Sequence, residues 1–220
     1  MFSSLFSKNF IDIIYLDNFI EYNSSIKFME DKILSIKTQK NNEALLFVHY
    51  HHLYTAGISF KNYNEIIDKS IKLYESNRGG KITYHGPGQR VIYIMLNLKK
   101  RGSDVKLFVK ALETVVIRSL AHFNINAFLH PEHVGVWIHD SNRNLKKICA
   151  LGIRIRNGIS YHGIAINIHP NLDFFSKIVP CGINDDSLGV TSLKNEGIDI
   201  SLTDFDSVFL KNFYSIFGGK

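Results

Sequence analysis

Residues 147–168 read KICALGIRIRNGISYHGIAINI, two apolar segments separated by a short polar one. This pattern predicts strands over residues 147–155 and 160–168, and residues 134–138 predict another strand just before them. Strands that follow one another at short intervals usually lie side by side in a sheet. The stretch therefore predicts a meander of antiparallel strands.

Outside this meander, strands and helices are interspersed without strict βαβ alternation. Ser201 and Asp204 have the spacing of a capping box that would open the last helix. The order of elements favours an α+β fold in a single domain over residues 1–220, and it disfavours a doubly wound fold. The predicted elements are helices over 19–35, 63–69, 104–123 and 202–216, and strands over 11–16, 44–50, 71–74, 82–84 and 91–98.

Composition narrows the class of protein. The chain has 220 residues, 45% hydrophobic and 21% charged, which is ordinary for a globular protein with one sizeable core. Its net charge of +6 favours an acidic partner. The 26 Lys and Arg residues are spread along the chain without a run of like charges, so no nucleic-acid-binding arm is expected.

Targeting signals and cysteine usage indicate the compartment. No apolar run approaches the ~18 residues of a membrane span, and the first ten residues lack the pattern of a signal peptide. The two cysteines, Cys149 and Cys181, lie 32 positions apart and form neither a CxxC pair nor a disulfide framework. These features predict a cytoplasmic protein in a reducing environment.

A glycine-rich stretch, RGGKITYHGPGQ at residues 78–89, is the first candidate for a binding site. Glycine lets the backbone turn sharply or approach a ligand closely. Arg78 could bind an anion, and His85 or Gln89 could orient a carbonyl group. The alternative is a pair of hairpin turns around a strand, and the stretch matches neither a Walker loop nor a GxGxxG turn.

Lys147 and the two cysteines are the candidates for covalent chemistry. Regular alternation on a strand would place Lys147 and Cys149 on one face and Ile148 on the other. Cys181 lies between Pro180 and Gly182, a turn context that can expose its sulfur, whereas Cys149 lies within an apolar strand. A solvated lysine and a buried structural cysteine remain the alternatives.

The ten histidines do not predict a metal site. His49, His51 and His52 cluster, as do His130 and His133, but neither group has a recognised zinc spacing, and only Glu132 adds a carboxylate. No metal is therefore expected.

Taken together, these stretches resemble the lipoyl(octanoyl) transferase family over about residues 44–195. The ordered set is specific, although each piece alone would be weak. The matching pieces are Arg78–Gln89, Lys147 with Leu151-Gly152, His162–Asn167, Pro180-Cys181-Gly182 and Thr191-Ser192-Leu193.

The resemblance implies a fold and an activity. The fold would be that of biotin and lipoate ligases, related to class II synthetases, with a mixed or antiparallel sheet, flanking helices and a catalytic region over about residues 40–216. The enzyme would transfer an octanoyl group from acyl carrier protein to a lysine of lipoyl domains, the first step of endogenous protein lipoylation. The acceptors would be 2-oxoacid dehydrogenase E2 subunits and the glycine cleavage H protein. No ATP, metal or other cofactor would be needed, because the donor thioester is already activated.

The resemblance also implies roles for individual residues. Cys181 would be the nucleophile that carries the acyl thioester. Lys147 would be the acid–base residue, and its ammonium would lower the pKa of the neighbouring thiol. The acyl-binding walls would be Arg78, Gly79, Gly80, Lys81, Ile82, Thr83, Tyr84, His85, Ala150, Leu151, Gly152, Gly163, Ile164 and Ala165.

One segment departs from the family pattern. Where the family has Glu-His-Pro-Pro before Thr55, this chain has His49-Tyr50-His51-His52.

Three other functions stay open. An ATP-dependent lipoate or biotin ligase would need no cysteine. A cysteine thioesterase or peptidase would pair the thiol with His85 or His162. A non-catalytic protein that binds an acidic partner would use only the positive charge.

Overall fold

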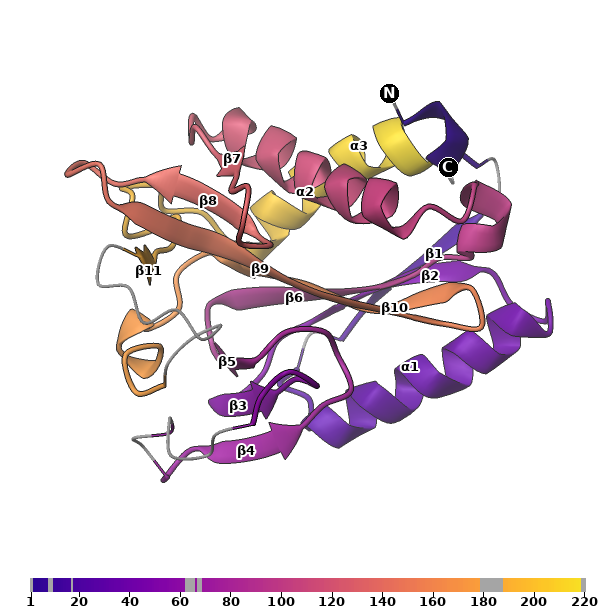
Figure 1. The fold of residues 1–220 in the computed structure, drawn as a ribbon, viewed down its shortest axis with the longest axis horizontal. Helices are drawn as coiled ribbons and strands as arrows, with labels where there is room; N and C mark the ends of the chain where they lie inside the picture. Colours follow the sequence, from indigo (N-terminus) through magenta and orange to yellow (C-terminus); the bar gives the residue numbers. More distant parts are fainter. Residues whose placement is uncertain are drawn as a thin grey trace.

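A mixed eight-stranded sheet forms the middle layer of the molecule, with helices on both faces (Figure 1). The computed structural model describes residues 2–7, 10–16, 18–61, 66, 69–178 and 188–218. In spatial order the sheet contains β1 (Ile11–Tyr15), β2 (Glu43–Val48), β6 (Gln89–Met95), β10 (Ile159–Asn167), β9 (Leu145–Arg156), β8 (Val136–His139) and β7 (Phe128–Leu129), and β11 (Leu188–Val190) also pairs with β9. A second sheet of β4 (Lys72–Glu75), β3 (Leu53–Ala56) and β5 (Ile82–His85) lies on the same side as helix α1 (Tyr22–Lys37).

The predicted meander is confirmed. β8, β9 and β10 are antiparallel neighbours, and β10 continues the antiparallel order to β6. Asn157 and Gly158 join β9 to β10 with φ values of 57° and 84°. Two successive positive φ values give the turn whose twist matches paired strands, which explains the tight connection.

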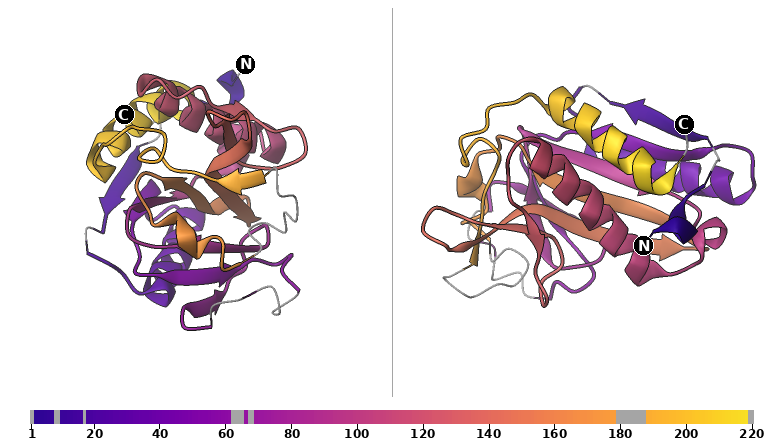
Figure 2. Two further views of the ribbon diagram at one scale, coloured as in Figure 1. Left: turned by 90° about the vertical axis from the view of Figure 1, so that its left-hand side faces the viewer. Right: turned by 90° about the horizontal axis from the view of Figure 1, so that it is seen from above.

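Two helices cover the other face of the large sheet. α2 (Val105–His122) and α3 (Leu202–Phe217) lie side by side across it, as the view from above shows (Figure 2). Asp104 caps α2 by accepting a hydrogen bond from the Leu107 N–H at 2.9 Å, and the predicted capping box of Ser201 and Asp204 opens α3. Both helices bury aromatic and aliphatic side chains against the sheet, so this layer holds the larger core.

A buried ion pair links the C-terminal helix to the sheet. The Nε of Arg90 on β6 donates to the Asp206 carboxylate on α3 at 3.0 Å. The exposed fractions of these side chains are 4% and 2%, so each charge depends on the other for compensation.

The structure also differs from the sequence predictions. Strands β3, β7 and β11 were not predicted, since they are short and lack a clear alternation of apolar and polar residues. Of the helix predicted over 63–69, only residues 66 and 69 are described: Ile66 forms an isolated bridge with Ile178, and Lys69 lies in a turn. The remaining residues of that prediction lie outside the described part of the chain.

Candidate active site

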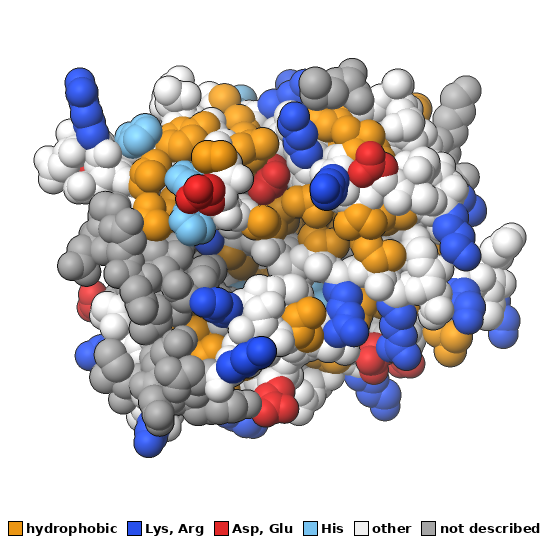
Figure 3. Space-filling model, in the orientation of Figure 1, with side chains coloured by type: hydrophobic (Ala, Val, Ile, Leu, Met, Phe, Trp, Pro, Cys, Tyr) orange, Lys and Arg blue, Asp and Glu red, His pale blue; other side chains and the backbone are white. Residues whose placement is uncertain are grey.

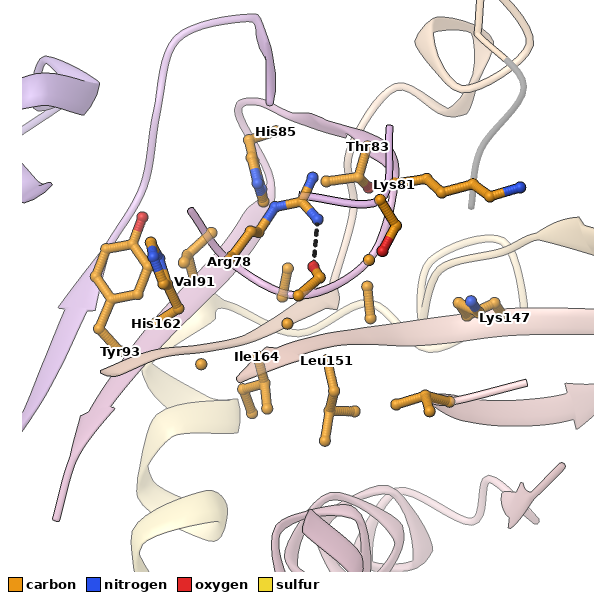
Figure 4. A pocket seen from close by; sticks show the side chains of 18 of the residues that line it. Arg78, Lys81, Thr83, His85, Val91, Tyr93, Lys147, Leu151, His162 and Ile164 are labelled. Carbon is orange, nitrogen blue, oxygen red and sulfur yellow. Dashed lines mark hydrogen bonds between the residues drawn. The ribbon is translucent and has the colours of Figure 1, made fainter. Parts of the chain in front are cut away.

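A pocket of about 330 Å³ lies between the large sheet and the glycine-rich stretch that leads into β5 (Figure 4). Its volume falls at the lower end of the ~300–1,000 Å³ usual for small-molecule sites. β6, β9 and β10 form the floor, and residues 78–85 form the opposite wall. The lining residues are Tyr22, Ser59, Arg78, Gly79, Gly80, Lys81, Thr83, His85, Val91, Tyr93, Glu132, His133, Val134, Lys147, Ala150, Leu151, Gly152, His162, Gly163, Ile164 and Ala165.

Most of the predicted wall residues lie in this one pocket. Ile82 and Tyr84 do not line it, because alternate residues of β5 face opposite ways. Both pack instead in a small cluster with Tyr54 and Phe175. Leu151 and Ile164 contribute mainly backbone, since their side chains point away from Arg78 in Figure 4 and pack in the core under α2 and α3.

Glycines on the floor make the approach of other groups possible. A Cβ at Gly163 would lie 1.8 Å from the Ile92 carbonyl oxygen of β6. A Cβ at Gly152 would lie 3.1 Å from Cδ of Arg78 and 3.4 Å from the Gly79 carbonyl oxygen. Glycine is thus required at 163 for strand pairing, and at 152 it lets the wall come close to the floor.

Arg78 braces the wall. Its Nη2 donates to the Thr55 carbonyl oxygen at 2.6 Å and its Nη1 to the Gly79 carbonyl oxygen at 2.9 Å. Nε also donates to Oγ1 of Thr55 at 3.1 Å. The guanidinium therefore holds the glycine-rich stretch against β3, and its charge faces the pocket.

Lys147 lies inside the pocket, at the end remote from Tyr93, Val91 and His162 (Figure 4). Its exposed fraction is only 7%, which is low for a lysine. The ammonium nitrogen stands 4.7 Å from the centre of the Trp137 ring, a cation–π contact. Its backbone carbonyl accepts the Thr191 N–H at 3.0 Å, next to the parallel pairing of β11 with β9.

The prediction that Lys147 and Cys149 share a strand face is wrong. Val136 of β8 pairs with Cys149 and Trp137 pairs with Lys147, so one residue of β9, Ile148, is extra. Such a bulge interrupts the alternation of side chains. Ile148 and Cys149 therefore both enter the core below α2, while Lys147 and Ala150 both face the pocket.

Cys149 has the surroundings of a structural cysteine. It is fully buried, and this burial, followed by the nearby Glu113 carboxyl, raises the pKa of its thiol far above the ordinary value. A thiol that stays protonated is a poor nucleophile.

Cys181, with its neighbours Pro180 and Gly182, lies outside the described residues. Described residues on both sides of that stretch are close to Lys147. Val190 pairs with Lys147, and Phe175 and Val190 line a second, small cavity together with it.

Two buried histidines of the pocket are neutral at neutral pH. Burial, and then the Arg78 charge, lowers the pKa of His85 to about 4 and that of His162 to about 3. Nδ1 of His85 donates to Oε1 of Gln89 at 2.6 Å, a tautomer inferred from the amide of Gln89 donating to Asn167 at 2.9 Å. His162 bonds Oδ1 of Asn77 through Nε2 at 2.9 Å. Both rings serve as fixed neutral parts of the wall.

These histidines predict acid-sensitive stability. Below pH ~6.5 the unfolded chain gains protons at His85 and His162 that the folded chain takes up only near pH 4 and 3. The free energy of unfolding should fall as the pH drops from about 6.5 to about 4, by on the order of 3 kcal/mol for each histidine. Urea denaturation across this range measures the slope, and His162→Gln should reduce it. An equal slope in that variant would contradict the assignment.

Several pocket residues were not predicted from the sequence. Val91 and Tyr93 could have been found, since alternate residues of a strand face the same side. Tyr22 and the loop residues Glu132, His133 and Val134 come from distant segments and carry no motif. In that loop Nδ1 of His130 accepts the backbone N–H groups of Glu132 and His133 at 3.1 and 3.2 Å, so this histidine shapes a turn.

Within the described ranges, no group of three or more His, Cys, Asp or Glu side chains is arranged to hold a metal ion. Across the same residues, no helix combines the length and apolar character that crossing a bilayer requires.

Known proteins share the fold of this chain. The family model "Lipoyl protein ligase A/B catalytic domain" matches residues 21–214, so the chain has the catalytic domain of that family. A bi-partite lipoate protein ligase from Thermoplasma acidophilum superposes with a TM-score of 0.67 at 17% identity, covering 95% of this chain and 83% of the ligase. A biotin protein ligase from Aquifex aeolicus gives 0.52 at 14% identity, with 94% and 68% covered. These likenesses confirm the predicted fold.

The sequence relatives are more specific. The octanoyltransferase of Wolbachia pipientis from Culex pipiens is 43% identical over 202 residues, 91% of this chain and 97% of the relative. That of Rhodospirillum rubrum is 41% identical over 93% of this chain and 94% of its own length. The chain belongs to the octanoyltransferase family, and it is an acyltransferase. The resemblance noted in the sequence is thus confirmed.

Proposed function

We propose that this chain transfers an octanoyl group from acyl carrier protein to a lysine of a lipoyl domain through a thioester on Cys181. The observation that carries the proposal is the burial of Lys147 at one end of a largely apolar pocket. A lysine buried inside a pocket is unusual, and a role in proton transfer would account for its position.

The reaction has two steps. The Cys181 thiolate attacks the carbonyl carbon of the donor thioester and forms the acyl-enzyme, while the Lys147 ammonium gives a proton to the leaving carrier thiolate and becomes a neutral amine. The amine of the acceptor lysine then attacks the acyl-enzyme, the neutral Lys147 accepts the amine proton and becomes an ammonium again, and the Cys181 thiolate is released. Backbone N–H groups of the glycine-rich wall would stabilise the oxyanion formed in each step.

The proposed partners suit the charge of the chain. Lys and Arg side chains lie scattered over the face shown in Figure 3, and the net charge is +6. An acidic acyl carrier protein and acidic lipoyl domains, those of the 2-oxoacid dehydrogenase complexes and the glycine cleavage H protein, would be attracted to this surface. A nucleophilic thiol must stay reduced, which favours the cytoplasm.

The pocket end remote from Lys147 would set the acyl chain length. Tyr22 and Tyr93 line the pocket there, and the Tyr93 hydroxyl bonds that of Tyr50 at 2.7 Å. Tyr50 in turn bonds Oγ of Ser25 at 2.5 Å, so α1 supports the wall from behind. Tyr50 belongs to the His49–His52 segment that departs from the family pattern, which gives this segment a structural place.

Shortening the wall is expected to favour longer chains. In Tyr93→Leu, room for two more methylenes at ~0.8 kcal/mol each should raise the rate on decanoyl relative to octanoyl substrate by roughly tenfold. Competition between the two acyl-carrier donors measures the ratio. Tyr74→Leu is the matched control, because Tyr74 is buried nearby but does not line the pocket. An unchanged ratio in Tyr93→Leu would show that the chain ends elsewhere.

The transfer is tested by mixing the protein with octanoyl-acyl carrier protein and a lipoyl domain, without ATP. An octanoyl mass gain on the enzyme that hydroxylamine removes, followed by gain on the lipoyl domain, is the expected result. Modification that requires ATP and free octanoic acid would replace the proposal with the ligase function. Release of the acid into water in place of transfer would replace it with a thioesterase.

A further inference from the structure

The Lys147 side chain on β9 is held by contacts with residues outside its own strand. The ring of Trp137 on β8 lies under the ammonium group at 4.7 Å, and Trp137 is fully buried. Its indole N–H donates to the His133 carbonyl oxygen at 3.0 Å, which fixes the ring to the preceding loop. The position of the Trp137 ring therefore depends on the loop at residues 133–135.

Gly135 in that loop borders the lysine side chain so closely that a larger residue would meet it. Its φ is 127°, and a Cβ there would lie 3.2 and 3.3 Å from Cε and Cδ of Lys147 and 2.8 Å from the Cys149 carbonyl oxygen. The methylenes of Lys147 thus pack against bare backbone. A displacement of this backbone would therefore change the space that is open to the lysine methylenes.

Glu113 of α2 holds this backbone in place. Its Oε1 accepts the Gly135 N–H at 3.2 Å, and its exposed fraction is 8%. Burial raises the pKa of its carboxyl. Val116, which lies one turn further along the same face of α2, is fully buried. A carboxyl in such a place is unfavourable unless it is paired, and the Gly135 N–H is the pairing partner that the structure shows.

We propose that Glu113 and Trp137 are positioning residues that fix Lys147 for proton transfer: Glu113 holds Gly135, Gly135 holds the lysine methylenes, and Trp137 holds the ammonium group. The inference rests on the proposed function in one respect, the role of Lys147 in the transfer. Glu113 lies on a helix of the opposite layer, so a contact between the α2 layer and the pocket would control the geometry of the reaction.

The experiment uses Trp137 as a probe, since it is the only tryptophan in the chain. Its emission spectrum in the full-length protein reports the group above the ring without any turnover. Lys147→Met should change this emission, because the ammonium group is removed. Glu113→Leu should change it in the same direction, whereas Glu113→Gln, which keeps an oxygen acceptor, should resemble the wild type.

Turnover is measured on the same variants. Glu113→Leu should lower kcat by roughly ten- to a hundredfold without raising the KM for the acyl donor, because the variant misplaces the group that moves the proton and leaves the donor contacts intact. Glu113→Gln should restore most of kcat. Ser119→Ala is the control: it removes another fully buried polar group of α2 that bonds the Val115 carbonyl and should leave both emission and kcat unchanged.

The outcomes separate this inference from the proposed function. Wild-type emission and kcat in Glu113→Leu would overturn the positioning role. Equal losses in Glu113→Leu and Glu113→Gln, in step with a lower melting temperature, would overturn it in favour of a purely structural carboxyl. If the emission changes as expected but Lys147→Met retains full turnover, the support exists and the proposed role of Lys147 is wrong.

Discussion

Cys181→Ala is expected to abolish acyl loading, with no octanoyl mass gain after incubation with octanoyl-acyl carrier protein. The proposed covalent intermediate cannot form without the thiol, and deletion of a nucleophile costs about 10⁴-fold or more in other enzymes that use one. Intact-protein mass spectrometry on wild type and variant gives the answer within one experiment.

Cys149→Ala is the matched control for this prediction. Cys149 is fully buried, so the variant should lose about 1–2 kcal/mol of stability and keep acyl loading. Loss of loading in both variants to the same extent would remove the assignment of Cys181 as the nucleophile.

Lys147→Ala is expected to lower transfer to the acceptor by about 10²–10⁴-fold, the usual contribution of a positioned acid–base group. The rate of transfer from the acyl-enzyme should fall, whereas the free energy of unfolding should change little, since the residue lies in the pocket and not in the hydrophobic core. Single-turnover measurement, starting from enzyme already loaded with octanoyl, isolates this step.

The neighbouring lysine provides the control. Lys146 is half-buried and does not line the pocket, so Lys146→Ala should transfer at nearly the wild-type rate. If Lys146→Ala were the damaging change, proton transfer would belong to a different face of β9.

The meander and the capped helices could be predicted from the sequence, because each depends on local signals. Apolar segments around Asn157 and Gly158 form β9 and β10, and Ser201 with Asp204 starts α3. The pairing of β11 with β9 could not be predicted. The three residues of β11 are too few to show an alternation of apolar and polar side chains, and the contact depends on the fold around Lys147.

The site was predictable where it follows motifs. Most of the predicted wall residues between Arg78 and Ala165 lie in one pocket, and the family resemblance groups them from the sequence alone. The exceptions have a physical cause. Ile82 and Tyr84 face away from the pocket because the side chains of β5 alternate between its two faces. Cys149 does not share the pocket face with Lys147, because the bulge at Ile148 interrupts this alternation on β9. Glu113 was missed because a carboxyl on a helix is ordinarily solvated, and only its depth in the structure shows otherwise.

The extra residue at Ile148 also matters to anyone who would transplant this chemistry into another scaffold. In a regular strand of the same sequence, Cys149 and Leu151 would stand beside Lys147, and Ala150 and Gly152 would turn to the opposite side. The smallest part that keeps the arrangement is therefore the pair of strands β8 and β9, in which β9 has one residue more than β8 between paired positions. Copying the sequence of β9 alone would place different side chains beside Lys147.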